Sequence, residues 1–269
     1  IPLRLVGSEM CIRDRWNFDL ADSPVFASNL GIKKYNTKIS SNSISQFNKN
    51  KNKEKLKLKK LQSFNIDDLN QDNKLNYKLA ELGILNSIKR MEFPSYYMQL
   101  NQRGGVQSYY ETGDRLVFSS KQDYEDWLVR LKAYALNIDN ALVNNKKGLE
   151  LGYSQPKLVT RGVTTQIKAI IDADMDNHPY LKVFINADET ILTKSDKEDL
   201  ISRATTLVRT KINPSYNNLY EFLVEDYLPN SRDSIGISDV PNGKEWYETL
   251  ANYHTTCLLY TSPSPRDVE

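Results

Sequence analysis

The stretch SKQDYEDWLVRLKAYALNIDNAL, residues 120–142, carries the clearest helical pattern in the chain. Its large apolar side chains recur every three or four residues, which is the period of one face of an α-helix. They are Tyr124, Trp127, Leu128, Leu131, Tyr134, Ala135, Ile138 and Leu142. Ser120 and Asp123 resemble an acidic variant of the capping box that begins a helix, and Gly152 is a candidate for its left-handed C-terminal cap. We expect the polar side chains of this helix mostly to face away from the apolar stripe; they include Glu125, Arg130, Lys132 and Asn137.

Two segments before this helix also read as helical. The polar, lysine-rich stretch 41–64 is best interpreted as a solvated helix, because lysines at every second position spread around a helix instead of forming one stripe. Asp67 or Asp68 can cap a second helix that runs to about Met91. Its inward residues are expected to be Leu69, Leu75, Leu79, Leu82, Leu85 and Ile88. Residues 16–45 are irregular and predict a short helix or loop.

Two further helices are expected after Gly152. Gln155-Pro156 begins one of them, with proline at the first helical position. Its stripe comprises Leu158 or Val159, Val163, Ile167, Ile170 and Ile171. Ser195-x-x-Glu198 has the form of a capping box and begins a long helical stretch, which Pro214 should kink or break. No alternating strand pattern and no repeat of 20–50 residues accompanies these helices. The predicted fold class is therefore all-α, a multi-helix array.

The length, hydrophobic content and net charge of the chain exclude some classes of function. The chain has 269 residues, of which 39% are hydrophobic, so it is long enough to bury a sizeable core. A net charge of +2 gives no global attraction to nucleic acid or to an anionic membrane, and the sequence contains no apolar run near 18 residues. We therefore expect no nucleic-acid partner and no transmembrane segment. Residues 49–60 carry seven lysines and form the only nucleic-acid candidate, a weaker reading than a solvated helix.

The two ends read as translated sequencing adapter. A DNA sequence that encodes residues 5–14 also encodes residues 257–266 when its reverse complement is slightly extended and read in a shifted frame. We therefore interpret residues 1–15 and 257–269 as adapter-like and residues 16–256 as a segment of a longer protein. Both cysteines, Cys11 and Cys257, lie in the adapter-like ends, so the segment itself has no disulfide or thiol chemistry.

No catalytic centre or metal site emerges from the residue pattern. Gly104-Gly105 predicts a turn or a close backbone approach, and no Gly-Lys-Ser/Thr follows at the spacing of a phosphate loop. The two histidines, His178 and His254, belong to no cluster of metal ligands. Residues 172–177 begin like a calcium loop but lack its glycine and its final glutamate, which favours an acidic helix end. No nucleophile motif is present.

The most informative loop and helix lie near residues 228–256. Arg232, beside Gly236, can hold a carboxylate in a bidentate pair, or it can fix the loop through Asp226 or Asp233. The helix that follows has one aromatic face, which is either a packing surface or the wall of a site; its members are Trp246, Tyr247, Leu250, Tyr253 and His254.

Three stretches together resemble a bacterial family called domain of unknown function 885. The first is Gly104-Gly105-Val106-Gln107. The second begins Asp123-Tyr124-x-x-Trp127-Leu128-x-Arg130-Leu131 and continues through Ile138-Asp139 and residues 148–156. The third joins Tyr227-Leu228-Pro229-x-x-Arg232-x-Ser234-Ile235-Gly236 to Pro241-x-Gly243-x-x-Trp246-Tyr247 and Tyr253-His254-Thr255-Thr256. The similarity covers residues 16–256 and is weakest before about residue 70.

The resemblance implies the N-terminal part of a larger helical protein related to zinc metallopeptidases of the gluzincin type, often exported or lipid-anchored. The family's zinc motif, His-Glu-x-x-Pro-Gly-His-His, is expected beyond residue 256. Zinc and a peptide substrate therefore belong to the longer protein, and no catalytic residue or metal ligand is carried over onto this chain. The expected substrate-binding wall residues are Gln102, Gly104, Gly105, Gln107, Arg232, Tyr253 and His254.

Two predictions remain to be separated. Either this segment belongs to a zinc-dependent peptidase and is inactive alone, or it is a non-catalytic helical binding or scaffold protein whose aromatic face meets a partner. In the first case the helices beyond Thr256 would cover an apolar face, and the segment alone should expose an unusually large apolar patch.

Overall fold

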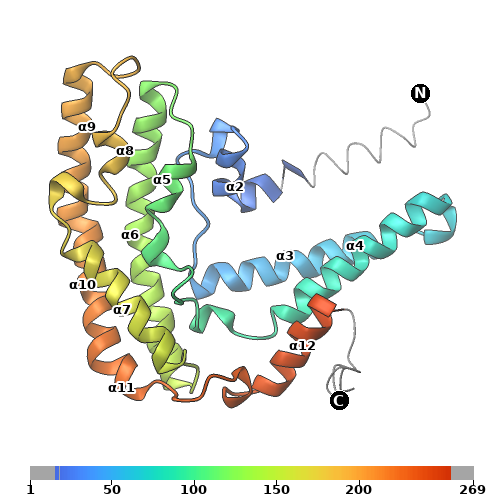
Figure 1. Cartoon of the computed structure of the whole chain (residues 1–269). Coiled ribbons are helices and arrows are strands. Elements are labelled where there is room, and N and C mark those ends of the chain that lie inside the picture. Colours follow the sequence, from blue (N-terminus) through green and yellow to red (C-terminus); the bar gives the residue numbers. More distant parts are fainter. Residues whose placement is uncertain (1–15, 18, 256–269) are drawn as a thin grey trace, which may run out of the picture. The chain divides into compact units, whose positions relative to one another are not determined.

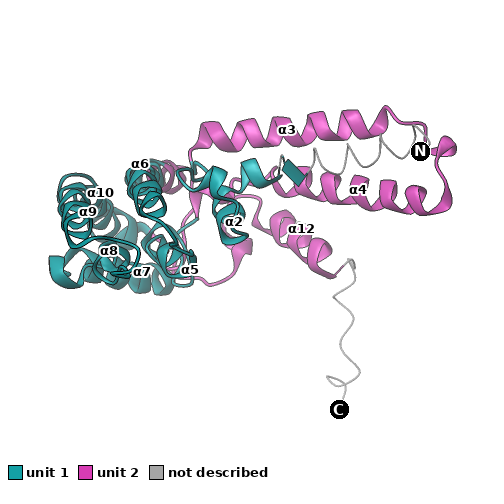
Figure 2. Cartoon of the chain, turned by 90° about the horizontal axis from the view of Figure 1, so that it is seen from above, with its two compact units in different colours: residues 1–42, 99–143, 157–230 teal, residues 43–98, 144–156, 231–269 magenta. Residues whose placement is uncertain are grey.

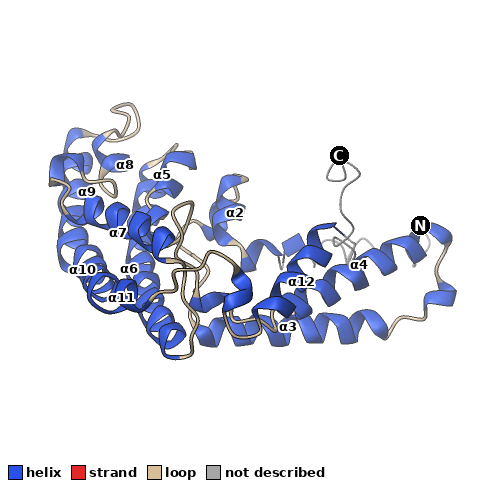
Figure 3. Cartoon of the chain, turned by 60° about the horizontal axis from the view of Figure 1, so that its bottom comes forward, coloured by secondary structure: helices blue, strands red, loops and turns tan. Residues whose placement is uncertain are grey.

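The structure is a computed structural model that describes residues 16, 17 and 19–255. Every regular element of these residues is a helix, and no strand occurs among them (Figures 1 and 3). The predicted all-α class is therefore confirmed. None of the described helices combines the length and the apolar character needed to cross a membrane. The two ends interpreted as adapter-like, 1–15 and 257–269, lie outside the described residues.

The chain divides into two compact units, each built from three separate stretches of sequence (Figure 2). Unit 1 comprises residues 1–42, 99–143 and 157–230, and unit 2 comprises residues 43–98, 144–156 and 231–269. The long helix α6, Lys121–Glu150, contributes residues to both units.

The described part of unit 1 begins with the helical residues 16–17 and 19–22 and continues through further α-helices and several 3₁₀ and π-helical turns. These further α-helices are α2 (Pro24–Asn29), α5 (Glu111–Arg115), the first part of α6, α7 (Lys157–Ile171), α8 (Lys182–Ile185), α9 (Lys194–Leu207), α10 (Asn213–Phe222) and α11 (Leu228–Asn230). Short 3₁₀ helices are η1 (Lys33–Tyr35), η4 (Val106–Ser108) and η5 (Met175–Asn177). Two π-helical turns are η6 (Val208–Ile212) and η7 (Leu223–Tyr227).

Helix α6 supplies the central face of the unit 1 core. The side chains of its predicted stripe from Tyr124 to Ile138 are buried, and Leu131 and Ile138 are completely inaccessible to solvent. The carboxylate of Asp123 accepts a hydrogen bond from the backbone N–H of Ser119, 2.9 Å away, which satisfies a free donor at the helix start. At the other end, Gly152 adopts the predicted left-handed conformation with φ of 81°.

The prediction that the polar side chains of α6 face solvent is wrong for two of them. Arg130 has none of its surface exposed and Asn137 has 3%. Asn137 donates through Nδ2 to the carbonyl of Ser40, and its own carbonyl accepts from the Nδ2 of Asn42. Partners far away in the sequence therefore satisfy Asn137 and the Nη2 of Arg130, and helical periodicity carries no signal of them.

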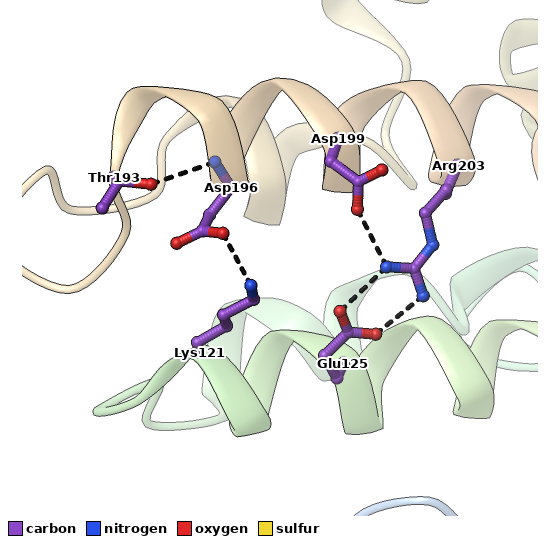
Figure 4. A network of polar contacts seen from close by, with 6 residues as sticks. All are labelled: Lys121, Glu125, Thr193, Asp196, Asp199 and Arg203. Carbon is purple, nitrogen blue, oxygen red and sulfur yellow. Dashed lines mark hydrogen bonds and ion pairs between the residues drawn. The ribbon is translucent and has the colours of Figure 1, made fainter.

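Ion pairs join α6 to α9 along one side of unit 1 (Figure 4). Arg203 makes a bidentate pair with Glu125, at 2.7 and 2.8 Å, and also contacts Asp199 at 3.0 Å. Lys121 pairs with Asp196 at 2.6 Å. The hydrogen bonds from Arg203 lower the pKa of Glu125 below its ordinary value. Because these groups are partly exposed, they contribute alignment more than stability.

The start of α9 differs from the sequence prediction. Thr193 is its N-cap and accepts from the backbone N–H of Asp196 at 3.1 Å, so the cap lies two residues before the predicted Ser195. Pro214 does not break the helix either. The preceding turn, η6, is π-helical. In this wider turn the backbone hydrogen-bond pattern shifts, so the helix continues through Pro214 although proline has no N–H to donate. The turn η7 precedes Pro229 in the same way.

Unit 2 contains a helical hairpin and the C-terminal helix. Its α-helices are α3 (Ile44–Gln62), α4 (Gln71–Arg90), the end of α6 and α12 (Gly243–Thr255); its 3₁₀ helices are η2 (Ile66–Asp68), η3 (Ser95–Tyr97) and η8 (Ile237–Asp239). Helices α3 and α4 lie side by side (Figure 2), and α12 packs against α4. No residue of α3 is buried, which confirms the predicted solvated helix.

The prediction for α4 is wrong in its cap and in its packing. Asn70, not Asp67 or Asp68, caps the helix by accepting from the backbone N–H of Asn73. Four of the six residues expected to face inward are exposed, namely Leu75 at 59%, Leu79 at 57%, Leu82 at 52% and Leu85 at 45%, whereas Leu69 and Ile88 are half-buried. The half-buried positions of α4 include Tyr77, Ala80 and Ile84, which lie on another face of the helix.

The core of unit 2 is a small aromatic cluster around Trp246. Its ring stacks on Phe93 with centroids 5.5 Å apart, and Val240 completes the buried set. Gly243 opens α12 at a close backbone approach. A Cβ atom at this glycine would lie 1.9 Å from the carbonyl oxygen of Ile237, so only glycine fits.

This contact predicts a stability difference between two glycines of unit 2. Gly243→Ala should destabilise the protein by roughly 1–3 kcal/mol, because the new methyl meets backbone atoms that cannot move aside. Gly83→Ala, in the interior of α4 with no atom within 4 Å of its added Cβ, should stabilise by about 0.5–1 kcal/mol. Urea unfolding of both variants measures this, and equal effects would refute the close approach.

Candidate functional site

The predicted Gln102–Gln107 segment forms a tight turn in unit 1. Asn101 and Gly104 exchange two backbone hydrogen bonds of 3.1 Å, and the Asn101 side chain accepts from the backbone N–H of Arg103 at 2.9 Å. Gly105 follows with φ of 140°, a conformation that favours glycine. The Gly-Gly pair is therefore a turn, as predicted.

Gln107 fastens this turn to helix α7. Its Nε2 donates to the carbonyl of Asn101 at 2.7 Å and lies 3.2 Å from Oε1 of Gln166. Gln166 in turn donates to the carbonyl of Gln102 at 2.9 Å. These bonds fix the orientation of the Gln107 amide, because its nitrogen faces backbone carbonyls. Gln107 is 3% exposed, and its Oε1 is a buried acceptor with no hydrogen-bond partner in the structure.

Two buried tyrosines hold the turn from the opposite side. The hydroxyl of Tyr216, on α10, donates to the carbonyl of Val106 at 2.7 Å. The hydroxyl of Tyr180 lies 2.8 Å from that of Tyr216 and is the donor, because the single proton of Tyr216 is already directed at Val106. Burial raises the pKa of both tyrosines well above the ordinary value, so both stay protonated.

A cavity of about 220 Å³ opens beside this turn. Its polar lining is rich in amides, from Gln102, Gln107 and Gln166, and in exposed charge of both signs, from Arg103 and Glu111. The remaining lining residues are Gly104, Ser108, Tyr110, Ala169, Ile170 and Pro179. Gly105 lies next to the unpaired oxygen, since a Cβ on it would come within 2.6 Å of Gln107 Oε1. The unpaired oxygen is therefore buried beside Gly105, while the Gln107 side chain lines the cavity.

The other predicted wall residues belong to unit 2. Arg232 donates to three backbone carbonyls, those of Ser154 at 2.9 Å, Ser234 at 2.8 Å and Gly236 at 2.5 Å. These bonds fix the loop through backbone carbonyls, and the expected ion pair with Asp226 or Asp233 stays a prediction. Binding of a carboxylate by Arg232 stays a prediction.

The aromatic helix α12 divides into a packed part and an exposed part. Trp246 is buried, whereas Tyr247 is 61% exposed and Tyr253 is 40% exposed. The guanidinium of Arg90 lies 4.3 Å from the centre of the Tyr253 ring, a cation–π contact, and His254 meets the same ring edge-on. Tyr253 also lines a polar cavity of about 260 Å³ between α4 and α12. A binding role for Tyr253 and His254 stays a prediction.

The second histidine is a structural residue of unit 1. His178 is completely buried, its Nδ1 accepts from the backbone N–H of Tyr180 at 3.3 Å, and its Nε2 lies 3.2 Å from Oδ1 of Asn213. The ring is therefore neutral, with its proton on Nε2. Within residues 16–17 and 19–255, no group of three or more His, Cys, Asp or Glu side chains is placed to hold a metal ion.

The positioning residues Gln166 and Tyr216 were missed at the sequence level. Gln166 lies 59 residues from Gln107, and Tyr216 lies 110 residues from Val106. Each is a polar group within an apolar helical stripe, a weak signal that marks a buried partner without identifying it.

A bacterial protein family matches most of the chain. The match covers residues 24–262 and carries the description "Bacterial protein of unknown function (DUF885)". A crystal structure described as "the putative lipoprotein from Colwellia psychrerythraea" has a similar fold, with a TM-score of 0.79 and 16% sequence identity. The similarity covers 93% of this chain and 45% of that chain, so this chain spans less than half of that protein's length. The search of curated proteins gives no match.

The tyrosine pair predicts a measurable loss of stability. Tyr216→Phe should cost roughly 1–3 kcal/mol, because it leaves the Val106 carbonyl and the Tyr180 hydroxyl buried without their partner. Tyr247→Phe, at an exposed position, should stay within about 0.5 kcal/mol of the natural protein. Chemical denaturation of both variants is the test; a neutral Tyr216→Phe would show that the hydroxyl does not hold the turn.

The buried histidine predicts loss of stability in mild acid. Burial lowers the pKa of His178 against the raising effect of its hydrogen bonds to Asn213 and the Ile170 backbone. The unfolded chain, with a histidine pKa of about 6.5, then binds a proton more readily than the folded protein, and stability falls as pH drops through this range.

His178→Gln should flatten this pH dependence between about pH 7.5 and 5. His254→Asn is the matched control, because the chain has only two histidines and His254 is exposed. Thermal unfolding across the pH range measures both variants. An unchanged slope in His178→Gln would contradict the neutral buried ring.

Proposed function

The chain belongs to the bacterial family of unknown function DUF885, and on that premise we propose that it forms a substrate-holding part of a zinc-dependent peptidase. In this proposal the longer protein hydrolyses peptides, whereas this chain binds them and performs no bond cleavage of its own. The proposal also places the protein outside the cytoplasm or on a lipid anchor, which the description of the structural neighbour as a lipoprotein supports.

The unpaired Oε1 of Gln107 is the observation that carries this proposal. Peptides carry one backbone N–H donor per residue. A hydrogen bond from such a donor would remove the free-energy cost of leaving the buried Oε1 of Gln107 without a partner. The amide itself cannot turn away, because its Nε2 is held by the Asn101 carbonyl and by Gln166. The Gln107 amide, which lines the cavity, is therefore fixed in orientation, with its unpaired Oε1 buried beside Gly105.

The charges at the cavity fit a peptide ligand as well. Arg103 and Glu111 both line the cavity and both are exposed. A guanidinium can bind a carboxylate of the ligand, and a carboxylate can bind an ammonium group. The amide floor and the two charged groups together favour a short polar chain over a purely apolar ligand.

Zinc does not fit the described residues of this chain. They contain no group of three His, Cys, Asp or Glu side chains at metal-binding distance. In this proposal the metal motif belongs to another part of the longer protein, so no chemical step is assigned to Gln107 or its neighbours. Their role in the proposal is to bind and orient.

The exposed surface of unit 2 fits cover by further helices of a longer protein, and it also fits a second candidate function, that of a non-catalytic binding protein. Four leucines on α4 and the ring of Tyr247 on α12 are exposed, which is unusual for apolar residues that recur at helical spacing. Trp246 is part of the packed core, so a test of this surface must use Tyr247 and the α4 leucines. Tyr247→Ala with Leu79→Ser should remove a partner in pull-downs while peptide binding to unit 1 is kept.

Peptide binding to the chain can be tested without changing the protein. A tripeptide that binds the cavity should lose at least about tenfold in affinity when the amide facing Gln107 is N-methylated, because the donor is lost and the acceptor stays unpaired. N-methylation of the other amide serves as the control. Isothermal titration calorimetry measures all three peptides. Equal affinities, or no binding by any of a set of tripeptides that carry free or capped ends, would overturn the proposed function.

A further inference from the structure

Arg130 is a buried cation of unit 1 on which the charge of Asp126, four residues earlier on α6, acts without a direct ion pair. Its side chain is completely inaccessible to solvent, and it forms no ion pair within the described residues. The Nη2 atom donates to Oγ of Ser28 at 2.7 Å and to the carbonyl of Tyr35 at 2.8 Å. Nε and Nη1 have no acceptor. Burial lowers the pKa of Arg130, yet a guanidinium remains protonated at neutral pH, so the charge stays.

A cavity of about 390 Å³ lies against the same face of α6, one turn earlier. Trp127 lines this cavity, is 1% exposed, and has an Nε1–H that is buried without an acceptor. Ser28 lines the cavity too, and its hydroxyl is the group to which Arg130 donates. Arg130 therefore lies directly behind the Ser28 wall. Trp127 and Arg130 of α6 are therefore both more than nine-tenths buried, and each has at least one N–H donor without an acceptor.

The carboxylate of Asp123 does not compensate this positive charge. It forms an ion pair with Lys33 at 2.7 Å and accepts further hydrogen bonds from Ser119 and Ser120. Partial burial alone would raise the pKa of Asp123, but these hydrogen bonds outweigh burial and lower the pKa to about 2. Asp123 is thus already satisfied by Lys33, and Arg130 has the charge of Asp126 nearby but no carboxylate in direct contact.

The remaining walls of the cavity are apolar. Leu30 and Val117 are 50% and 81% exposed at its rim, and Leu116 and Phe118 also line it. Apolar side chains with this exposure gain from contact with an apolar group. The cavity therefore joins an apolar rim to the side chain of Trp127, and the unpaired donors of Arg130 lie behind its Ser28 wall.

We propose that this cavity of unit 1 binds a carboxylate carried on an apolar group, with the carboxylate accepting from Trp127 Nε1 and offsetting the charge of Arg130. A medium-chain fatty acid and the C-terminal residue of a peptide with an apolar side chain share this chemistry. The site is separate from the Gln107 cavity, so it does not rest on the proposed peptide-binding function.

The ligand class is tested first on the natural protein. Decanoate represents the fatty acid, and N-acetylphenylalanine represents the peptide C-terminus. Each is titrated beside a neutral partner, decanamide or N-acetylphenylalanine amide, and acetate tests whether charge alone suffices. Calorimetry should show saturable binding of at least one carboxylate, at least about tenfold tighter than its amide and than acetate.

Comparison of the two carboxylates identifies the ligand class. Tighter binding of decanoate assigns the site to a fatty acid, and tighter binding of N-acetylphenylalanine assigns it to a peptide C-terminus. Absence of binding by both, or binding of the amides or of acetate as tight as that of the carboxylates, would overturn the proposal.

Variants then locate the binding. Trp127→Phe keeps the ring and removes the Nε1–H, and Arg130→Met removes the charge at similar length; each should weaken carboxylate binding at least about fivefold. Trp246→Phe, a buried tryptophan of unit 2, is the control and should bind as the natural protein does. Circular dichroism checks that each variant is folded.

If Arg130→Met does not fold, Trp127→Phe and the acid–amide comparison still decide the question. Undiminished binding by folded Trp127→Phe would place the ligand elsewhere and refute the site.

Discussion

One face of α6 is the constraint on which unit 1 depends. The residues of this face have at most 4% of their surface exposed over more than three helical turns; they are Tyr124, Trp127, Leu128, Leu131, Tyr134 and Ile138. Burial of this much apolar surface is the main favourable contribution to folding, and it fixes the rotation of α6 about its axis. Once the rotation is fixed, Arg130 must lie inside, because it occurs on the same face three residues after Trp127. The polar network around Arg130 follows from this packing.

The candidate peptide site depends on contacts between distant parts of the sequence. The Asn101–Gly104 turn is local, since its two backbone hydrogen bonds and the Asn101 side chain lie within four residues. Its position is not local, because Tyr216 of α10 and Gln166 of α7 hold it from two sides. The Nε2 of Gln107 donates to the Asn101 carbonyl and to Gln166, whereas its Oε1 has no partner. A rigid turn with one unpaired oxygen is therefore a consequence of how α7 and α10 pack.

Sequence patterns predicted the helices well where packing and periodicity agree. The stripe of α6, the left-handed Gly152 and the Gly104-Gly105 turn are all as expected. The prediction failed for α4, because the leucine period identifies an apolar face but cannot say whether any element covers it. It failed for Arg130 as well, since charge normally favours solvent and only partners such as Ser28 and Tyr35, far away in the sequence, make burial possible. Gln102 and Gln107 were predicted from the family resemblance, whereas Gln166 and Tyr216 required the fold.

The central claim is that the Gln107 cavity holds peptide backbone. A crystal structure of this chain with a bound tripeptide tests it most directly. The account predicts a peptide N–H within about 3.2 Å of Gln107 Oε1, with the Gln107–Gln166 contact unchanged. A peptide bound at another surface, or one whose N–H groups all point away from Gln107 Oε1, would contradict it.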